Sequence, residues 1–352
     1  MSSFHACFSS PGYLILGVIS TVILAFAIKY TLHSNSDKPD KMSNTSSEEP
    51  EFEALYSGAN DVIVVKQDDG ILKSSPLHVF VGKFENWETL TQSRENKEAE
   101  IHVNGQNIPG IYIEIRESGV AKNEHSEKTC KFTELQLKRM NLIHGLNNAL
   151  FIIRELDVKI PFSIFLYDQN TKVIVSDIDG TITTSDGRGF LGAELGVDVH
   201  HEGVVEFLHK VAIQGYIIIY LTARPIAFDL QTRRYLFEDL VEEEHGYKLP
   251  KHPLFLTPAV MAEAVVSNAA EHTEAKSATL KYLMNLFKNK SNIVHGAYGN
   301  KDSDTEAYRN IGIPDDRIFI INKQSHMINV GTKLPTSYKE HAKFIDKMYP
   351  NV

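Results

Sequence analysis

The stretch Val173-Ile174-Val175-Ser176-Asp177-Ile178-Asp179-Gly180-Thr181 decides the fold class of this 352-residue chain. Its first three residues form a short apolar run, which predicts a buried strand. Two carboxylates separated by one residue follow, and Gly180 permits the chain to turn there. The stretch therefore predicts a strand that ends in a turn carrying two acidic side chains.

Strands and helices alternate downstream of this stretch. Apolar runs at 216–221, 293–298 and 317–321 predict strands, and apolar residues at helical spacing predict helices at 203–211 and 279–287. This alternation indicates an α/β fold with a parallel sheet covered on both faces. Because ligands of such sheets bind at the carboxyl ends of the strands, the polar residues at those ends form the candidate site.

The two acidic residues suit phosphoryl transfer. Asp177 can attack phosphorus and form an aspartyl-phosphate, and Asp179 can protonate the leaving oxygen and then activate water. The alternative is a solvated Asp-Gly turn with no chemistry. The motif is complete and three further polar elements follow it in the expected order, which favours the catalytic interpretation.

The first two of these elements are candidate phosphate-binding groups. Thr222 and Ala223 follow the strand at 216–221, where the Thr222 hydroxyl and the neighbouring amides can hold phosphoryl oxygens. Lys276 stands at the start of a predicted helix and can neutralise phosphoryl charge, although most single lysines only solvate a surface. The third element, Gly299 to Asp304, supplies oxygen ligands.

Within that element, Asn300 and Asp304 are candidate ligands for a hard divalent cation, and Asp302 is the weaker candidate. Mg²⁺ prefers carboxylates, phosphate oxygens and water in an octahedron. Together the four elements resemble the haloacid-dehalogenase-like phosphatase superfamily.

The resemblance is closer to one family, the lipins. Residues 176–186 resemble the lipin catalytic motif, and His201-Glu202-Gly203 and Tyr220-Leu221-Thr222-Ala223-Arg224 resemble the signatures downstream of it. Residues 57–65, continuing to 75–79, resemble the amino-terminal lipin region. The similarity covers residues 55–116 and 130–325.

This resemblance implies a Mg²⁺-dependent phosphatidate phosphatase that releases diacylglycerol. It implies that Asp177, Asn300, Asp304 and the backbone carbonyl of Asp179 hold one Mg²⁺. It also implies that the amino-terminal region joins the strands before the catalytic motif in one split immunoglobulin-like domain. Large lipins carry a long, Ser-rich, basic insert between the two regions, whereas this chain has a short loop.

The N-terminal segment is the most hydrophobic part of the chain. Between Tyr13 and Leu32 there is one charge in 20 residues, about the length that crosses roughly 30 Å of hydrocarbon. A membrane anchor, a cleaved signal peptide and a buried helix are the three possibilities. No positive charge precedes the apolar run, which argues against a signal peptide. Lys29, Lys38 and Lys41 lie on its C-terminal side, so the positive-inside rule predicts that the remainder of the chain faces the cytosol.

Together the sequence pattern and the resemblance predict an α/β fold, with a haloacid-dehalogenase-like Rossmannoid catalytic domain, a split immunoglobulin-like β-sandwich and an N-terminal transmembrane helix. The expected parts are an anchor (11–32), a disordered linker (33–54), an amino-terminal lipin-like β region (55–116), a loop (117–130), the remaining sandwich strands (131–168), the catalytic domain (169–325) and a C-terminal tail (326–352).

The composition of the chain excludes several kinds of partner and site. The net charge of −9 argues against broad binding to the phosphate backbone of nucleic acids. Two cysteines far apart exclude a disulfide scaffold and a four-cysteine zinc site. The expected substrate is phosphatidate in an endoplasmic reticulum or nuclear-envelope membrane, and the oligomeric state is left open. Two other functions are a non-catalytic phosphatidate sensor, disfavoured by the two acidic residues, and a phosphatase of a soluble or protein phosphomonoester.

Overall fold

The structure is a computed structural model that describes residues 57–81, 99–109, 114–115, 121–122, 130–154, 157–184, 200–242, 244–258, 269–288 and 292–352. All of them belong to one compact unit, Pro50–Val352. The predicted anchor and linker lie outside the described residues. No helix among the residues described is both long and apolar enough to cross a membrane.

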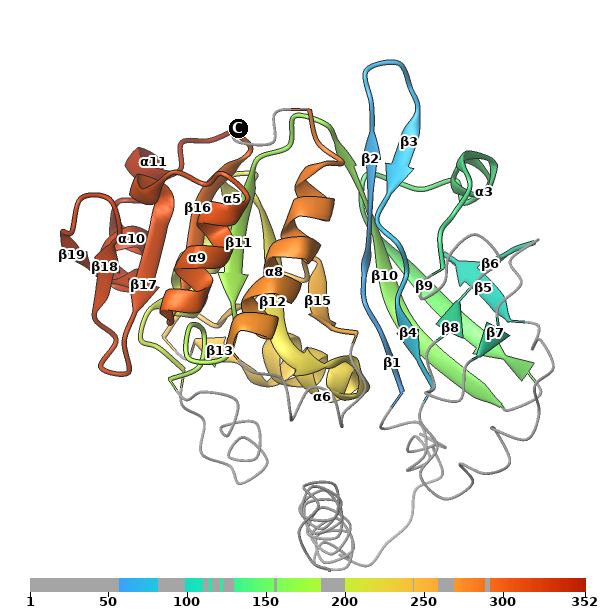
Figure 1. The fold of residues 1–352 in the computed structure, drawn as a ribbon, viewed down its shortest axis with the longest axis horizontal. Coiled ribbons are helices and arrows are strands. Elements are labelled where there is room, and N and C mark those ends of the chain that lie inside the picture. The colour runs from blue at the N-terminus through green and yellow to red at the C-terminus, as the bar shows by residue number, and fades with distance from the viewer. Residues whose placement is uncertain are drawn as a thin grey trace, which may run out of the picture. The chain divides into compact units, whose positions relative to one another are not determined.

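The predicted α/β fold is confirmed by a seven-stranded sheet (Figure 1). Its order is β15 (Leu254–Thr257), β12 (Ile217–Pro225), β11 (Val173–Asp177), β16 (Val294–Gly299), β17 (Ile318–Ile321), β18 (Met327–Asn329) and β19 (Pro335–Thr336). The first five strands pair in parallel. Strand β18 pairs antiparallel with β17, and β19 pairs antiparallel with β18. Since β11 occupies an interior position, the carboxylates at its end face the strand ends on both sides.

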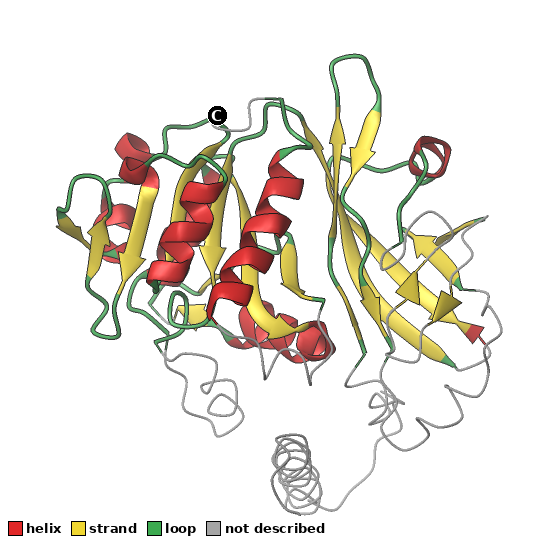
Figure 2. Ribbon diagram, in the orientation of Figure 1, coloured by secondary structure: helices red, strands yellow, loops and turns green. Residues whose placement is uncertain are grey.

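Helices cover both faces of this sheet, as Figure 2 shows in red. One face packs against α5 (Val204–Ile213), α10 (Tyr338–Lys343) and α11 (Ile345–Met348). The other packs against α8 (Ala269–Met284) and α9 (Asp302–Asn310). Side chains of β11 alternate between the faces, because Ile174 belongs to the first core whereas Val173 and Val175 belong to the second.

The β-rich part forms a six-stranded sheet in the order β3 (Leu72–Ser74), β2 (Val62–Lys66), β10 (Val158–Asp168), β9 (Gly145–Ile153), β5 (Glu100–Val103) and β6 (Gln106–Ile108). Strand β2 comes from the amino-terminal region and pairs in parallel with β10, which precedes the acidic motif. The two regions that resemble lipins therefore share one sheet. Val62 and Val64 of β2 pack in a separate core formed by residues of the β-rich part, whereas Ile63 and Val65 pack in the core under α8.

Shorter elements complete the described chain. They are β1 (Gly58–Ala59), β4 (Val79–Phe80), β7 (Glu114–Ile115), β8 (Ala121–Lys122), α3 (Glu134–Arg139), η3 (Ile226–Phe228), α6 (Asp229–Arg234), η4 (Tyr235–Asp239), β13 (Val241–Glu242), β14 (Tyr247–Lys248) and η5 (Asp315–Arg317). Helix α3 stands in the segment 131–168, for which the sequence predicts only strands; Thr133 caps its N-terminus in a capping box with Gln136.

Asn60 and Asp61 tie the amino-terminal region to the seven-stranded sheet. The Asn60 side chain exchanges two hydrogen bonds with the backbone of Leu256 at 2.7 and 2.9 Å. Asp61 is fully buried, accepts from the Leu254 amide at 2.8 Å and forms an ion pair with Arg233 of α6.

Glycine is required beside this contact. A Cβ on Gly58 would lie 2.1 Å from the carbonyl oxygen of Ile226, closer than two atoms can approach. Strand β1 therefore lies directly against the segment that follows β12.

The predicted C-terminal tail, 326–352, is wrong. Residues 327–329 and 335–336 extend the sheet, α10 buries Tyr338, His341 and Ala342, and α11 buries Ile345. A boundary at 325 is too early because these residues join the core through tyrosines and a histidine. Such side chains carry no strong apolar periodicity for a sequence pattern to detect.

Candidate active site

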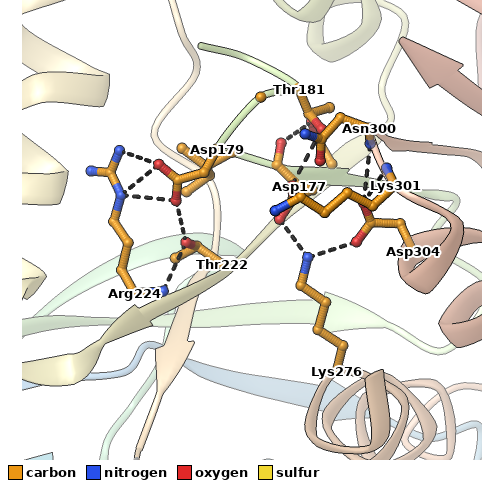
Figure 3. A network of polar contacts seen from close by, with 12 residues as sticks. Asp177, Asp179, Thr181, Thr222, Arg224, Lys276, Asn300, Lys301 and Asp304 are labelled. Atoms are coloured by element: carbon orange, nitrogen blue, oxygen red, sulfur yellow. Dashed lines mark hydrogen bonds and ion pairs between the residues drawn. The ribbon is translucent and has the colours of Figure 1, made fainter. Parts of the chain in front are cut away.

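Asp177 ends β11 and is 4% exposed. Its Oδ1 accepts a hydrogen bond from Nζ of Lys276 at 2.6 Å, and its Oδ2 accepts one from Oγ1 of Thr181 at 3.3 Å (Figure 3). Gly180 has a φ of 83°, the left-handed conformation that suits glycine. The chain can therefore turn after Asp179 and bring Thr181 back to Asp177.

Asp304 lies on the other side of Lys276. Its Oδ1 accepts from Nζ of Lys276 at 2.7 Å, while its Oδ2 accepts from the amides of Asn300 and Lys301 at 3.0 and 3.1 Å. A Cβ on Gly299 would lie 2.5 Å from Cβ of Asp304. Glycine at the end of β16 is thus what allows this carboxylate, 1% exposed, to approach the strand.

Asp179 faces a different group of partners, which come from the end of β12. Arg224 donates to it through Nε, at 3.0 and 3.1 Å, and through Nη2, at 2.7 Å. The Thr222 hydroxyl donates to its Oδ2 at 2.9 Å and in turn accepts from the Arg224 amide at 3.1 Å. A bidentate guanidinium fixes both position and orientation of a carboxylate. Asp179 is thus held by two side chains of one neighbouring strand.

Burial and charge act against each other at Asp177. Burial raises the pKa of Asp177 to about 7, and Lys276 opposes that rise. Burial alone would lower the pKa of Lys276, but Asp177 and Asp304 outweigh it and hold that pKa above its ordinary value. Lys276 is therefore a charged ammonium between two carboxylates.

One ammonium against the carboxylates of Asp177 and Asp304 leaves negative charge in excess in a buried place. Charges in such surroundings need a partner. The donors at hand are carboxylate oxygens and the side-chain oxygen of Asn300, which is partly buried beside them. Oxygen donors of this kind are those that a hard divalent cation prefers. The residues present therefore fit a cation such as Mg²⁺.

The sequence-predicted residues meet at one edge of the sheet, although Lys276 comes from the interior of α8 and not from the start of a helix, as the sequence predicts. Asp177, Lys276 and Asp304 are joined by hydrogen bonds, Asp179 binds Thr222, and the Asn300 amide binds Asp304. Ala223 lies between Thr222 and Arg224 on β12.

Sequence reasoning misses two partners in this site. Arg224 and Thr181 each belong to a motif, but neither motif assigns them a contact. Arginine two residues after Thr222 at a strand end is the available signal, because a partly buried carboxylate such as Asp179 is stabilised by a cationic partner.

Two family models match this chain. Residues 128–350, more than half of the chain, match the model of LNS2 (Lipin/Ned1/Smp2), and residues 41–137 match the lipin N-terminal conserved region.

Curated relatives have consistent names. The chain is 32% identical over 232 residues to phosphatidate phosphatase LPIN3 of Mus musculus, covering 64% of this chain and 27% of the relative. It is 32% identical over 234 residues to phosphatidate phosphatase LPIN1 of Homo sapiens, covering 65% and 26%. It is 31% identical over 255 residues to phosphatidic acid phosphohydrolase 1 of Saccharomyces cerevisiae, covering 66% and 29%.

The chain thus spans less than a third of the length of these relatives. The two matched regions nevertheless contain the strands of the shared sheet, and the LNS2 region also contains the residues of the polar site. The chain belongs to the LNS2 (Lipin/Ned1/Smp2) family and carries the lipin N-terminal conserved region.

Proposed function

We propose that this chain is a Mg²⁺-dependent phosphatidate phosphatase that hydrolyses phosphatidate to diacylglycerol and phosphate. The observation that carries the proposal is the pairing of Asp177 with Lys276 and of Asp179 with Arg224 at adjacent strand ends. This arrangement separates two carboxylates two residues apart into different surroundings, and different surroundings give paired carboxylates different roles. The names of the relatives supply the substrate.

In the first step an oxygen of Asp177 forms a bond to phosphorus while the bond from phosphorus to the diacylglycerol oxygen breaks. Asp179 gives its proton to that oxygen, and diacylglycerol leaves. In the second step Asp179 takes a proton from water, whose oxygen attacks phosphorus. Phosphate departs and the Asp177 carboxylate is restored.

The remaining residues bind and orient the phosphoryl group. Thr222 and the amide of Ala223 accommodate its oxygens, and Lys276 neutralises part of its charge. Mg²⁺ held by Asp177, Asn300, Asp304 and the backbone carbonyl of Asp179 would stabilise the charge that the phosphoryl group carries during transfer.

Two further proposals concern organisation: the family relationship supports the first, and the apolar run between Tyr13 and Leu32 supports the second. The α/β unit is a haloacid-dehalogenase-like domain, and the six-stranded sheet is the main part of a split immunoglobulin-like domain. The segment 11–32 anchors the chain in an endoplasmic reticulum or nuclear-envelope membrane, with the site facing the cytosol.

Phosphate release tests this function. The full chain would be assayed on phosphatidate in mixed micelles and on glycerol 3-phosphate in solution, each with Mg²⁺ and with EDTA. We expect Mg²⁺-dependent release from phosphatidate and little from the soluble ester. Binding of phosphatidate without release would instead favour a sensor, and equal release from both esters a phosphatase of soluble phosphomonoesters.

A further inference from the structure

The three carbonyls that follow Asp179 in the acidic turn are each held by a hydrogen bond. The carbonyl oxygen of Gly180 lies 3.1 Å from Nε2 of His201, that of Thr181 accepts from the Tyr338 hydroxyl at 3.0 Å, and that of Ile182 accepts from the His201 amide at 2.9 Å. His201 and Tyr338, which lie far apart in the chain, therefore both form hydrogen bonds to the backbone of one turn.

The ring of His201 is oriented for this contact. Its Nδ1 lies 2.8 Å from Oγ of Ser325. A carbonyl can only accept, so Nε2 carries the proton and Nδ1 is free to accept from the Ser325 hydroxyl. His201 is fully buried, and so is its bond to the Gly180 carbonyl, so water does not compete for that bond.

Tyr338 reaches the turn from α10 and is 1% exposed. Its ring is stacked on that of Phe207 of α5, with 5.6 Å between the ring centroids. Packing fixes the ring, and a fixed ring places the hydroxyl at the Thr181 carbonyl without further cost in side-chain entropy.

We propose that His201 and Tyr338 are positioning residues that set the acidic turn in its reactive geometry. They touch none of the atoms that react. By fixing the carbonyls of Gly180 and Thr181 they fix the backbone between Asp179 and the Thr181 hydroxyl that binds Asp177. The catalytic meaning of this role rests on the proposed function.

The first test replaces Tyr338 by Phe in the full chain. This keeps the ring and removes one hydrogen bond. We expect kcat on micellar phosphatidate to fall about tenfold or more, because small displacements of reacting groups are costly, with KM little changed and a melting temperature that falls no further than in Tyr349→Phe. Tyr349→Phe is the matched control, since its buried hydroxyl contacts Tyr298 at 2.6 Å and not the turn.

A second pair of variants covers the possibility that Tyr338→Phe fails to fold. A Gln side chain places an amide nitrogen near Nε2 of the replaced histidine, whereas an Asn side chain reaches only to Nδ1. His201→Gln should therefore retain much more of kcat than His201→Asn. Equal kcat values for the two, both near that of the unmodified chain, would overturn the proposal.

Hydrogen exchange separates this proposal from the proposed function. The amides of Thr181, Ile182 and Thr183 all donate to the Ile178 carbonyl, at 3.2, 2.8 and 3.1 Å, so they report on the turn without substrate. We expect faster exchange at these amides in Tyr338→Phe and not in Tyr349→Phe. Unchanged exchange and unchanged kcat overturn the positioning role. If the unmodified chain leaves phosphatidate intact, the proposed function fails, and exchange alone then decides whether the turn is held.

Discussion

Replacing Arg233 by Met should destabilise the fold strongly. Arg233 is 17% exposed and binds Asp61 at 3.0 Å and Asp229 at 2.7 Å, and both carboxylates are almost wholly buried. Without the guanidinium, two buried carboxylates lose their cation. Breaking a buried pair in this way costs about 3–5 kcal/mol, a large part of the roughly 5–15 kcal/mol that folded domains have.

The loss should depend on pH. Burial raises the pKa of Asp229 to about 7 even with Arg233 opposing that rise. A carboxyl group whose folded pKa exceeds its unfolded value destabilises the fold increasingly as the pH rises between the two values. Since removing Arg233 raises the folded pKa further, the variant should lose less stability at pH 5 than at pH 8.

Urea unfolding followed by circular dichroism, at both pH values, measures these losses. Arg234→Met is the matched control, because its side chain is 74% exposed and lies 4.0 Å from Asp239. Exposed pairs of this kind contribute about 0–1 kcal/mol. If Arg233→Met costs no more than Arg234→Met, the ion-pair argument for how residues 57–61 are attached is refuted.

Three other outcomes follow from the structure. Asp304→Asn should raise the Mg²⁺ concentration for half-maximal phosphate release by about tenfold or more, as loss of a ligand partner does. Asp302 is exposed, so Asp302→Asn should leave that concentration unchanged. An unchanged Mg²⁺ requirement in Asp304→Asn would contradict the assignment of Asp304 as a ligand. Burial lowers the pKa of His341 to about 4, so between pH 6.5 and 4 the unfolded chain binds a proton that the folded chain does not, and stability should fall as the pH drops through this range. In acid unfolding, His341→Phe should remove about 3 kcal/mol of that fall. If the stability of His341→Phe falls as steeply as that of the unmodified chain, His341 is not the source. The full chain should resist carbonate extraction and need detergent, because a hydrophobic helix attaches almost irreversibly; recovery in the soluble fraction would rule out an anchor at 11–32.

The sequence predicts the α/β alternation and most of the site because both are local. A buried strand followed by a polar turn is recognisable within a few residues, and β11, β12, β16 and β17 all stand where apolar runs predict them. The parallel topology then brings their carboxyl ends to one edge of the sheet without further information. The sequence pattern alone therefore suffices to group Asp177 with Asp304, whereas Lys276 reaches them from within α8, which no strand end specifies.

Other features depend on contacts between distant residues. Strand β15, Leu254–Thr257, is not predicted from the sequence, because four residues preceded by a proline and followed by another carry no period. The parallel pairing of β2 with β10 joins two strands that are about 90 residues apart in the chain, and helix α3 lies between them. The pairing of Arg224 with Asp179 likewise requires adjacent strand ends, which the chain order alone does not specify.

The most direct test of the central claim is the turnover of Asp177→Asn. An amide retains the shape of the carboxylate but cannot form the aspartyl-phosphate, so the variant should fold like the unmodified chain and release no measurable phosphate from phosphatidate in micelles with saturating Mg²⁺. Turnover near that of the unmodified chain would contradict nucleophilic catalysis by Asp177.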